Sequence, residues 1–519
     1  MNMSHQKNDD DIDSSLPSLT VQMRRAVQDL RDRMDELRTK MTGDDADAFP
    51  SVILQSAWLS SEKYQEQRHE GLQDIHKRLH GCCDMLPIDT ICVHDDGSSW
   101  HVISDDPNNS CSDCGEMKTA CQFKQQYCIR NVPCLIRGLD TSHFADVSGQ
   151  WRSGMKINTE WFQKFVGDNA LVPIRIDNSA TSYSDLSSQN DLHNEQNGLD
   201  DDGRAQECET QHMKLVDWIV QCQKQPAAHH SGYLKDWHLV QYLLDKQSNH
   251  PDEPLPSLPL YTTPSFFERD LLNNFLQNYV GGDYKFVYWG PDGSRTGLHS
   301  DVMHTFSWSF NVVGRKKWIF HLPFHLSTCC HDEGSHPDSS NKCFEVIQEA
   351  GEAIFVPSTW KHEVTNLVET LSINHNWITS ASIDQSWQCL LVEMASIENE
   401  VRQWGISEDE FGARENMLRG CAGLNVTMFA LIILLEMMEL LLMLFDDACG
   451  DVERGDDGKT WDCAFSIFRL EKVLNDVMSH QSTIQRLESI LESKTDALYV
   501  KECADKTFKY VSMLKKVPK

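Results

Sequence analysis

The feature that most constrains the fold is a series of short apolar runs between Arg295 and Trp377. The runs are rich in Ile, Val, Phe and Trp, residues that favour strands, and each is shorter than a typical helix. They are Phe306 to Val313, Lys317 to Leu322, Ala353 to Val356, Glu363 to Leu367 and Thr370 to Trp377. We therefore expect strands throughout this stretch.

The same stretch carries residues that can ligate a metal ion. His299 and Asp301 are two positions apart, and alternate residues of a strand share a face, so both side chains can contact one ion. His362 stands at the start of a later run and is placed to supply a third ligand. Two imidazoles and one carboxylate, with further positions open, form the facial triad that binds non-haem Fe(II).

An H-x-D pair alone is a weak signal in a chain with 22 His. Because His331 and His336 lie in a polar loop, we expect them to be solvated, and the same holds for the two histidines that flank Pro323. The histidines that compete with the triad are His304, His321, His325, His331, His336 and His375.

Length, charge and cysteine spacing bound the class of protein. A chain of 519 residues is long enough for two or three domains. A net charge of −31 argues against binding nucleic acid through phosphate contacts. Met1 to Ser15 has no apolar core typical of a signal peptide, and the 18 Cys lack a disulfide framework. We expect reduced thiols in the cytoplasm, with the nucleus as the alternative.

Two local patterns leave alternatives open. Cys111 and Cys114 form a C-x-x-C that is either half of a zinc site or, as we favour, two ordinary thiols. Apolar residues from Met23 to Met41 follow steps of four and three, which is the spacing of a heptad seam. This helix either packs on its own protein or forms an intermolecular coiled coil.

The order of patterns predicts three parts. Residues 1–80 combine a disordered start with the helical extension, residues 81–380 hold the strands and the metal ligands, and residues 381–519 are helical. A polar insertion at about 178–212 is expected to be flexible.

Val426 to Phe445 is apolar enough to require a membrane test. It contains Glu436 and Glu439, and a carboxylate near the middle of a span costs about 2.5–3.5 kcal/mol. We therefore expect no membrane span but a helix buried in protein, with a homodimer through the C-terminal helices as one possible form.

Longer motifs around the triad resemble the JmjC family of Fe(II)- and 2-oxoglutarate-dependent oxygenases. The likeness is carried by Thr296 to Asp301, Phe306 to Phe320, Glu349 to His362 and Ser372 to Trp377, with Tyr284 to Pro291 and Tyr233 to His238 before them. It implies an α+β fold built on a double-stranded β-helix, in which two facing antiparallel sheets form an open barrel with iron at its mouth.

The resemblance also implies roles for individual residues. It assigns Fe(II) to His299, Asp301 and His362. It assigns the distal carboxylate of 2-oxoglutarate to Lys316 and Thr296, with Tyr183 as a further contact. Ser309 stands where several relatives have an Asn near the cosubstrate. Asn374 and Asn376 share a strand face and are expected to face the site, with Asn376 the better match.

What the resemblance implies for activity is a dioxygenase that uses Fe(II), 2-oxoglutarate and O2. The reaction releases succinate and CO2 and proceeds through a ferryl intermediate to hydroxylate a substrate C–H bond. The expected substrate is a protein, most specifically a lysine of the translation release factor. The alternatives are a histone or other N-methyl-lysine demethylase, and a catalytically silent scaffold.

Overall fold

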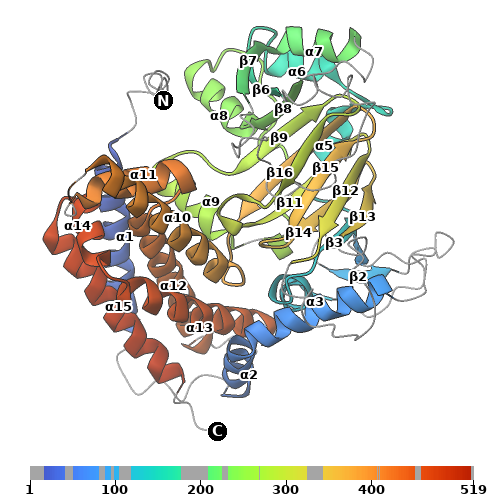
Figure 1. The fold of residues 1–519 in the computed structure, drawn as a ribbon. Helices are drawn as coiled ribbons and strands as arrows, with labels where there is room; N and C mark the ends of the chain where they lie inside the picture. The colour runs from blue at the N-terminus through green and yellow to red at the C-terminus, as the bar shows by residue number, and fades with distance from the viewer. Residues whose placement is uncertain are drawn as a thin grey trace, which may run out of the picture. The chain divides into compact units, whose positions relative to one another are not determined.

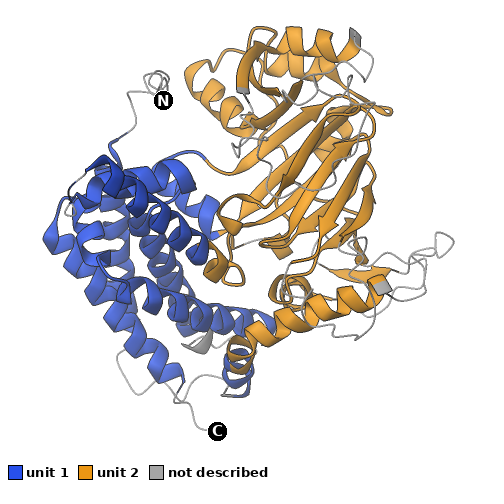
Figure 2. Cartoon of the chain, viewed as in Figure 1, with its two compact units in different colours: residues 1–58, 271–282, 387–519 blue, residues 59–270, 283–386 orange. Residues whose placement is uncertain are grey.

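The computed structural model describes residues 17–40, 51–80, 88–94, 99–103, 118–176, 209–224, 232–267, 269–323, 343–405, 407, 410–449 and 457–515. Tyr183, the Cys111–Cys114 pair and most of the expected insertion lie outside the described residues. Contacts group the chain into two compact units, coloured separately in Figure 2. Unit 1 takes residues 1–58, 271–282 and 387–519, and unit 2 takes residues 59–270 and 283–386. The sequence-based division followed chain order, whereas these contacts join the N-terminal helix to the C-terminal helices.

The described part of unit 1 is helical. Its elements, of which α2 and α10 cross the unit boundary, are α1 (Leu19–Lys40), α2 (Ser51–Glu62), α9 (Leu271–Phe275), η7 (Leu276–Val280), α10 (Ile383–Trp404), α11 (Phe411–Ala422), α12 (Val426–Cys449), α13 (Asp457–Ser479), α14 (Thr483–Leu491) and α15 (Lys494–Leu514). Helix α11 ends at Gly423, which adopts a left-handed conformation (φ 75°).

The N-terminal heptad packs within its own unit. Met23, Val27, Leu30, Met34 and Leu37 of α1 are fully buried. The helix contacts α12, α14 and α15, and Arg31 of α1 pairs with Asp496 of α15. Of the two interpretations of the heptad, packing on the same protein is therefore the one that the structure supports.

Helix α12 is the one helix in the described chain that is long and apolar enough to cross a membrane. Residues Val426–Asp446 have a mean hydropathy of 2.4, and 83% of that apolar window is buried inside the protein. Glu439 pairs with Arg33 of α1. This burial agrees with the expected protein-buried helix, while the absence of membrane binding and the dimer stay predictions.

Unit 2 carries all of the described strands. Its helical elements are α3 (Tyr64–His80), α4 (Ala120–Phe123), η3 (Lys124–Ile129), α5 (Ala145–Gln150), α6 (Thr159–Phe165), α7 (Leu215–Lys224), α8 (Leu239–Asn249), η6 (Ser265–Phe267) and η8 (Val302–His304). Its strands are β1 (Asp89–Val93), β2 (Trp100–Ile103), β3 (Cys134–Arg137), β4 (Arg152–Ser153), β5 (Lys156–Ile157), β6 (Leu171–Ile176), β7 (Glu209–Lys214), β8 (Gly232–Trp237), β9 (Lys285–Gly290), β10 (Arg295–His299), β11 (Phe306–Val313), β12 (Lys316–His321), β13 (Cys343–Gln348), β14 (Ala353–Val356), β15 (Lys361–Asn366) and β16 (Thr370–Trp377).

Two sheets organise this unit (Figure 1). The larger has ten strands in the order β2-β1-β3-β14-β11-β16-β9-β8-β6-β7, and only its β1–β3 pairing is parallel. The smaller has four antiparallel strands in the order β10-β15-β12-β13. The fold class is therefore α+β, as expected from the sequence.

The alternation of side chains along β12 gives the four-stranded sheet one buried face. In β12 the residues alternate between buried and half-buried, which points Lys316, Trp318 and Phe320 to one face. The turn from β11 into β12 requires a glycine: Gly314 has φ 92°, and a Cβ there would lie 2.3 Å from the carbonyl oxygen of Glu369. The expected strands at residues 306–313, 353–356 and 370–377 match β11, β14 and β16.

Candidate metal centre and its pocket

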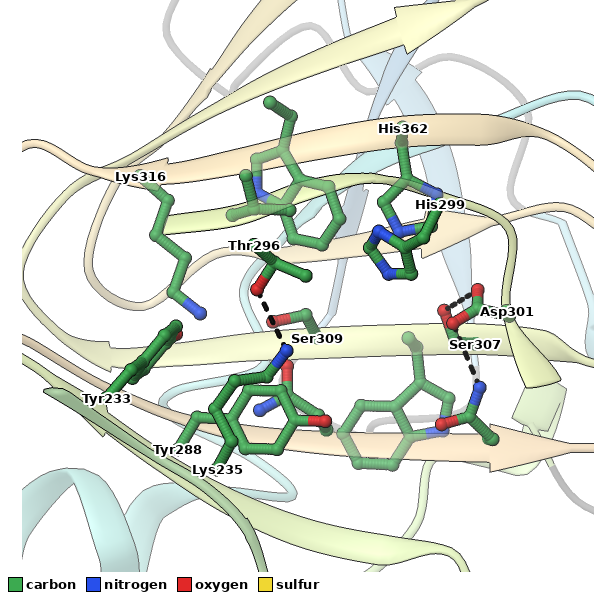
Figure 3. A pocket seen from close by; sticks show the side chains of 15 residues that line it. Tyr233, Lys235, Tyr288, Thr296, His299, Asp301, Ser307, Ser309, Lys316 and His362 are labelled. Atoms are coloured by element: carbon green, nitrogen blue, oxygen red, sulfur yellow. Dashed lines mark hydrogen bonds between the residues drawn. The ribbon is translucent and has the colours of Figure 1, made fainter. Parts of the chain in front are cut away.

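One pocket collects nearly all of the residues singled out by the sequence. The ten-stranded sheet contributes side chains from β8, β9, β11 and β16, and the four-stranded sheet contributes β10, β12 and β15 (Figure 3). The lining residues are Tyr233, Lys235, Tyr288, Thr296, His299, Asp301, Ser307, Trp308, Ser309, Lys316, Trp318, His362, Val364, Asn374 and Asn376.

Strand pairing brings the three expected metal ligands together at one end of this pocket. His299 of β10 lies directly opposite His362 of β15 in the antiparallel register, and their ring centroids are 4.3 Å apart. One ligand atom from each of His299, Asp301 and His362 lies within 4.8 Å of the other two. β10 ends at His299, so Asp301 belongs to the segment after the strand and not to the strand expected from the H-x-D spacing; its backbone is still extended.

Each histidine is oriented by the backbone carbonyl of the residue two positions before it. Nδ1 of His299 is 2.8 Å from the carbonyl oxygen of Gly297, and Nδ1 of His362 is 3.0 Å from that of Trp360. A carbonyl oxygen only accepts hydrogen bonds, so each Nδ1 carries the proton and each Nε2 lone pair is left for a metal.

The carboxylate of Asp301 is held at both oxygens. Ser307 Oγ donates to Asp301 Oδ2 at 2.8 Å, and Asn376 Nδ2 donates to Asp301 Oδ1 at 3.0 Å. The Asn376 amide also donates to Thr305 Oγ1. In this structure Asn376 therefore faces the site, as expected, and positions a candidate metal ligand, while a contact with the cosubstrate stays a prediction.

The protonation state of His299 suits metal binding. Burial, with a further contribution from neighbouring His362, lowers the pKa of His299 to about 4. Neutral imidazole is the ligating form, so His299 requires no costly deprotonation near neutral pH. Two imidazoles and one carboxylate are a donor set that fits Fe(II).

The other end of the pocket is cationic. Lys316 is 1% exposed, and its Nζ donates to Ser372 Oγ at 2.6 Å. Asn374 also donates to Ser372 Oγ, at 3.0 Å, which links the two residues through one hydroxyl. Burial, and secondarily the charge of Lys235, lower the pKa of Lys316 to about 7.

Thr296 lies between the two ends, and its hydroxyl accepts a hydrogen bond of 2.9 Å from Lys235 Nζ. Sequence reasoning quoted the motif Tyr233 to His238 but assigned none of its residues to the site. β8 places both Tyr233 and Lys235 in the pocket, and Tyr288 of β9 joins them. Period-two alternation, which puts residues 233 and 235 on one face, is the signal that could have found them.

Ser309, where the resemblance placed a departure, also lines the pocket. Ser309 is 2% exposed, and its Oγ has no hydrogen-bond partner in the described part of the chain. A buried hydroxyl without a partner is costly unless a ligand or water satisfies it. This orphaned oxygen therefore fits a pocket that receives a polar small molecule.

None of the competing histidines that the structure describes enters the cluster. His375 lies on the other face of β16, where it hydrogen-bonds Tyr261 at 2.6 Å and packs on Trp308. His321 is 3.0 Å from Glu363, and His304 is absent from the pocket lining. His325, His331 and His336 lie outside the described residues.

The chain is similar to proteins named as 2-oxoglutarate and iron-dependent oxygenases and to one named as a demethylase. A mouse protein named 2-oxoglutarate and iron-dependent oxygenase JMJD4 is 33% identical over 381 residues, which cover 69% of this chain and 82% of the mouse protein. A zebrafish protein of the same name is 38% identical over 216 residues, 38% of this chain and about half (48%) of its own length. An Arabidopsis thaliana protein named arginine-specific demethylase JMJ20 is 33% identical over 251 residues, 42% of this chain and 52% of its own. No protein-family model matches the chain.

Proposed function

This chain belongs to the JmjC family of 2-oxoglutarate and iron-dependent oxygenases, alongside the JMJD4 proteins, and we propose that it hydroxylates a protein side chain. Fe(II), 2-oxoglutarate and O2 are the cofactor and cosubstrates of that family. The observation that carries the proposal is the convergence of His299, Asp301 and His362 at one end of a pocket whose other end holds Lys316.

In this proposal the three ligand side chains hold Fe(II). Bound iron would supply the oxidation in which O2 converts 2-oxoglutarate to succinate and CO2 and one oxygen atom enters a substrate C–H bond. The chain's own part is orientation. The carbonyls of Gly297 and Trp360 fix the imidazoles, and Ser307 and Asn376 fix the carboxylate.

We assign the opposite end of the pocket to 2-oxoglutarate. Lys316 and Thr296 would hold the distal carboxylate, because a buried ammonium is stabilised by an anion that water cannot screen. The orphaned Ser309 hydroxyl and the Asn374 amide would serve the part of the molecule nearer the metal. Tyr183 stays a prediction. At this level of detail we interpret the two sheets as the two faces of a double-stranded β-helix.

The proposed substrate is a lysine of the translation release factor. Its support is the resemblance to the JMJD4 proteins, together with a net charge of −31 that suits a basic substrate surface. A cytoplasmic location, with the nucleus as alternative, fits that substrate. The absence of nucleic-acid partners and a homodimer through the C-terminal helices belong to the same proposal.

A second candidate is removal of a methyl group from a protein side chain. The name of the Arabidopsis relative specifies arginine demethylation, which favours methyl-arginine over the methyl-lysine expected from the sequence alone. The same centre serves both reactions, because hydroxylation of an N-methyl carbon gives an unstable product that loses formaldehyde. A silent scaffold would not need the complete triad.

Mass spectrometry separates these functions. Release factor is incubated with the Fe(II)-loaded chain, 2-oxoglutarate and O2, and its peptides are measured beside methylated arginine and lysine peptides. Hydroxylation adds one oxygen atom, whereas demethylation removes one methylene. A gain of oxygen on a release-factor lysine supports the proposal, and demethylation alone supports the second candidate.

Variants of the metal ligands test the site itself. His299→Ala and Asp301→Ala should reduce substrate oxidation to background and leave the fold intact, because both side chains act only as ligands in this assignment. His321→Gln is the matched control, since His321 pairs with Glu363 outside the pocket. Full activity in either ligand variant would contradict the iron assignment. If the unmodified chain forms no succinate with any candidate substrate, the result would favour a scaffold.

A further inference from the structure

Lys235 is a second cation in the pocket that the roles assigned so far do not use. Its side chain lines the pocket from β8, and its Nζ donates to Thr296 Oγ1 at 2.9 Å. Figure 3 shows the Lys235 and Lys316 nitrogens directed into the same space, with the Thr296 hydroxyl beside them. An anion that contacts Lys316 and Thr296 must therefore also lie near Lys235.

Aromatic rings fix the direction of the Lys235 side chain. Its Nζ lies 5.7 Å from the centroid of the Tyr233 ring and 5.2 Å from that of the Tyr288 ring. The two rings pack edge to face, 5.9 Å apart. Tyr288 is held by a hydrogen bond of 2.9 Å from its hydroxyl to Asp236, and Asp236 pairs with Arg175. The ammonium is thus presented to the pocket by a rigid support.

The backbone of β8 contributes to this geometry. The pairing of β8 with β9 is irregular between Leu234 and Trp237, and Asp236 adopts φ 57°, which is unusual for a residue with a side chain. Such irregularities re-aim side chains, and they concentrate at functional sites because surrounding structure must hold them. Here the irregular stretch contains Lys235, and the residue with positive φ is the one directly after it.

The charge of Lys235 acts on the other cation of the pocket. Its repulsion contributes, after burial, to the lowered pKa of Lys316. Among the lining residues that the structure describes, the only carboxylate is Asp301, whose oxygens already accept from Ser307 and Asn376. The cationic end of the pocket is therefore arranged to receive a carboxylate from outside the chain.

We propose that Lys235 and Lys316 together grip the distal carboxylate of 2-oxoglutarate, one ammonium for each oxygen. This inference rests on the proposed function, because it takes 2-oxoglutarate as the molecule that enters the pocket. On binding, the Lys235 ammonium exchanges part of its contact with the Thr296 hydroxyl for a contact with the carboxylate. The pocket then selects a dicarboxylate over a 2-oxo acid with an uncharged end.

Calorimetric titration of the Fe(II)-loaded full chain without O2 tests the proposal, since it measures binding and not turnover. Lys235→Met should weaken 2-oxoglutarate binding by about tenfold to a hundredfold, the usual effect of losing a charged hydrogen bond. Lys235→Arg should retain most of the affinity. Lys317→Met is the matched control, because Lys317 pairs with Glu345 and does not line the pocket.

A second ligand identifies the carboxylate involved. 2-Oxopentanoate keeps the 2-oxo acid group and lacks the distal carboxylate, so its binding should be the same in the Lys235→Met variant and the unmodified chain. Equal losses for both ligands would place Lys235 at the metal-binding end and overturn the proposal. Unchanged 2-oxoglutarate binding in Lys235→Met would also overturn it. Failure of the unmodified chain to bind 2-oxoglutarate would instead reject the proposed function. Thermal unfolding and iron content of each variant show that loss of binding is not loss of fold.

Discussion

The two units treat buried charge in opposite ways. In unit 1, Glu415 is fully buried and pairs with Arg486, which is 3% exposed, at 2.9 Å. Thr427 also donates to the Glu415 carboxylate, and Arg486 contacts Glu398 at 3.4 Å. These charges are satisfied by the chain itself.

In unit 2, Lys316 is as deeply buried but has a hydroxyl for a partner. In the described part of the chain no carboxylate contacts its ammonium, and the side chain donates to Ser372. Burial dominates its lowered pKa, and the next contribution is repulsion from Lys235. A buried cation whose partners are neutral weakens the fold, so its retention points to a ligand. A buried charge that the chain pairs with an opposite charge stabilises the fold, whereas a buried charge that the chain leaves with neutral partners is suited to bind a ligand.

The largest effect on stability should come from breaking the pair in unit 1. Glu415→Leu leaves the Arg486 guanidinium buried without its main partner, which should cost about 3–5 kcal/mol of unfolding free energy. Chemical denaturation followed by circular dichroism measures it. The double variant Glu415→Leu/Arg486→Met should recover much of this loss, because an apolar pair replaces the ion pair. A single variant as stable as the unmodified chain would show that the pair is not structural.

Lys316→Met should have the opposite profile. Removing a buried ammonium leaves no charged partner behind in the chain, so we expect unchanged or higher thermal stability. Binding of 2-oxoglutarate should weaken by about a hundredfold, because the incoming carboxylate loses its buried partner. Calorimetry and thermal unfolding on the same sample measure both, with Lys317→Met as control. If Lys316→Met were less stable but still bound 2-oxoglutarate normally, Lys316 would be a charge that stabilises the fold and not one that binds the ligand.

The smallest effect is a dependence of 2-oxoglutarate affinity on pH. Lys316 has a pKa of about 7 in the chain alone, and a bound carboxylate favours the charged form and raises that pKa. Below pH 7 the ammonium is already protonated, so affinity should not vary through this group. Above pH 7 binding takes up a proton, and affinity should fall by up to about tenfold per pH unit until the pKa of the complex is passed.

Proton uptake at pH 8 can be read from calorimetry in buffers of different ionisation enthalpy. The unmodified chain should take up protons on binding, and Lys316→Met should lose this uptake. A buffer-independent binding enthalpy in the unmodified chain would mean that Lys316 is charged throughout. In that case its surroundings supply more stabilisation than the hydroxyl of Ser372.

The sequence predicted the site correctly where polar side chains follow the two-residue alternation of a strand. The shared face of Asn374 and Asn376 follows from strand geometry, and the structure places both of them in the pocket together with Lys316. The sequence did not predict that the Asn376 amide donates to Asp301. That contact depends on the pairing of β11 with β16 and on the path of the chain after β10, which no local pattern specifies.

The sequence by itself determined the inventory: two histidines and a carboxylate for a metal, a lysine for an anion, and a heptad with an apolar helix for a helical core. These follow from local spacing, since period and residue type are properties of neighbouring positions. Tertiary structure decided how the expected metal ligands meet, because His362 lies opposite His299 only through the register of β10 with β15. It also decided that the heptad packs in its own chain and that Lys235 enters the pocket. Those outcomes depend on contacts between residues far apart in the chain, and the number of residues between two positions does not give their distance in space.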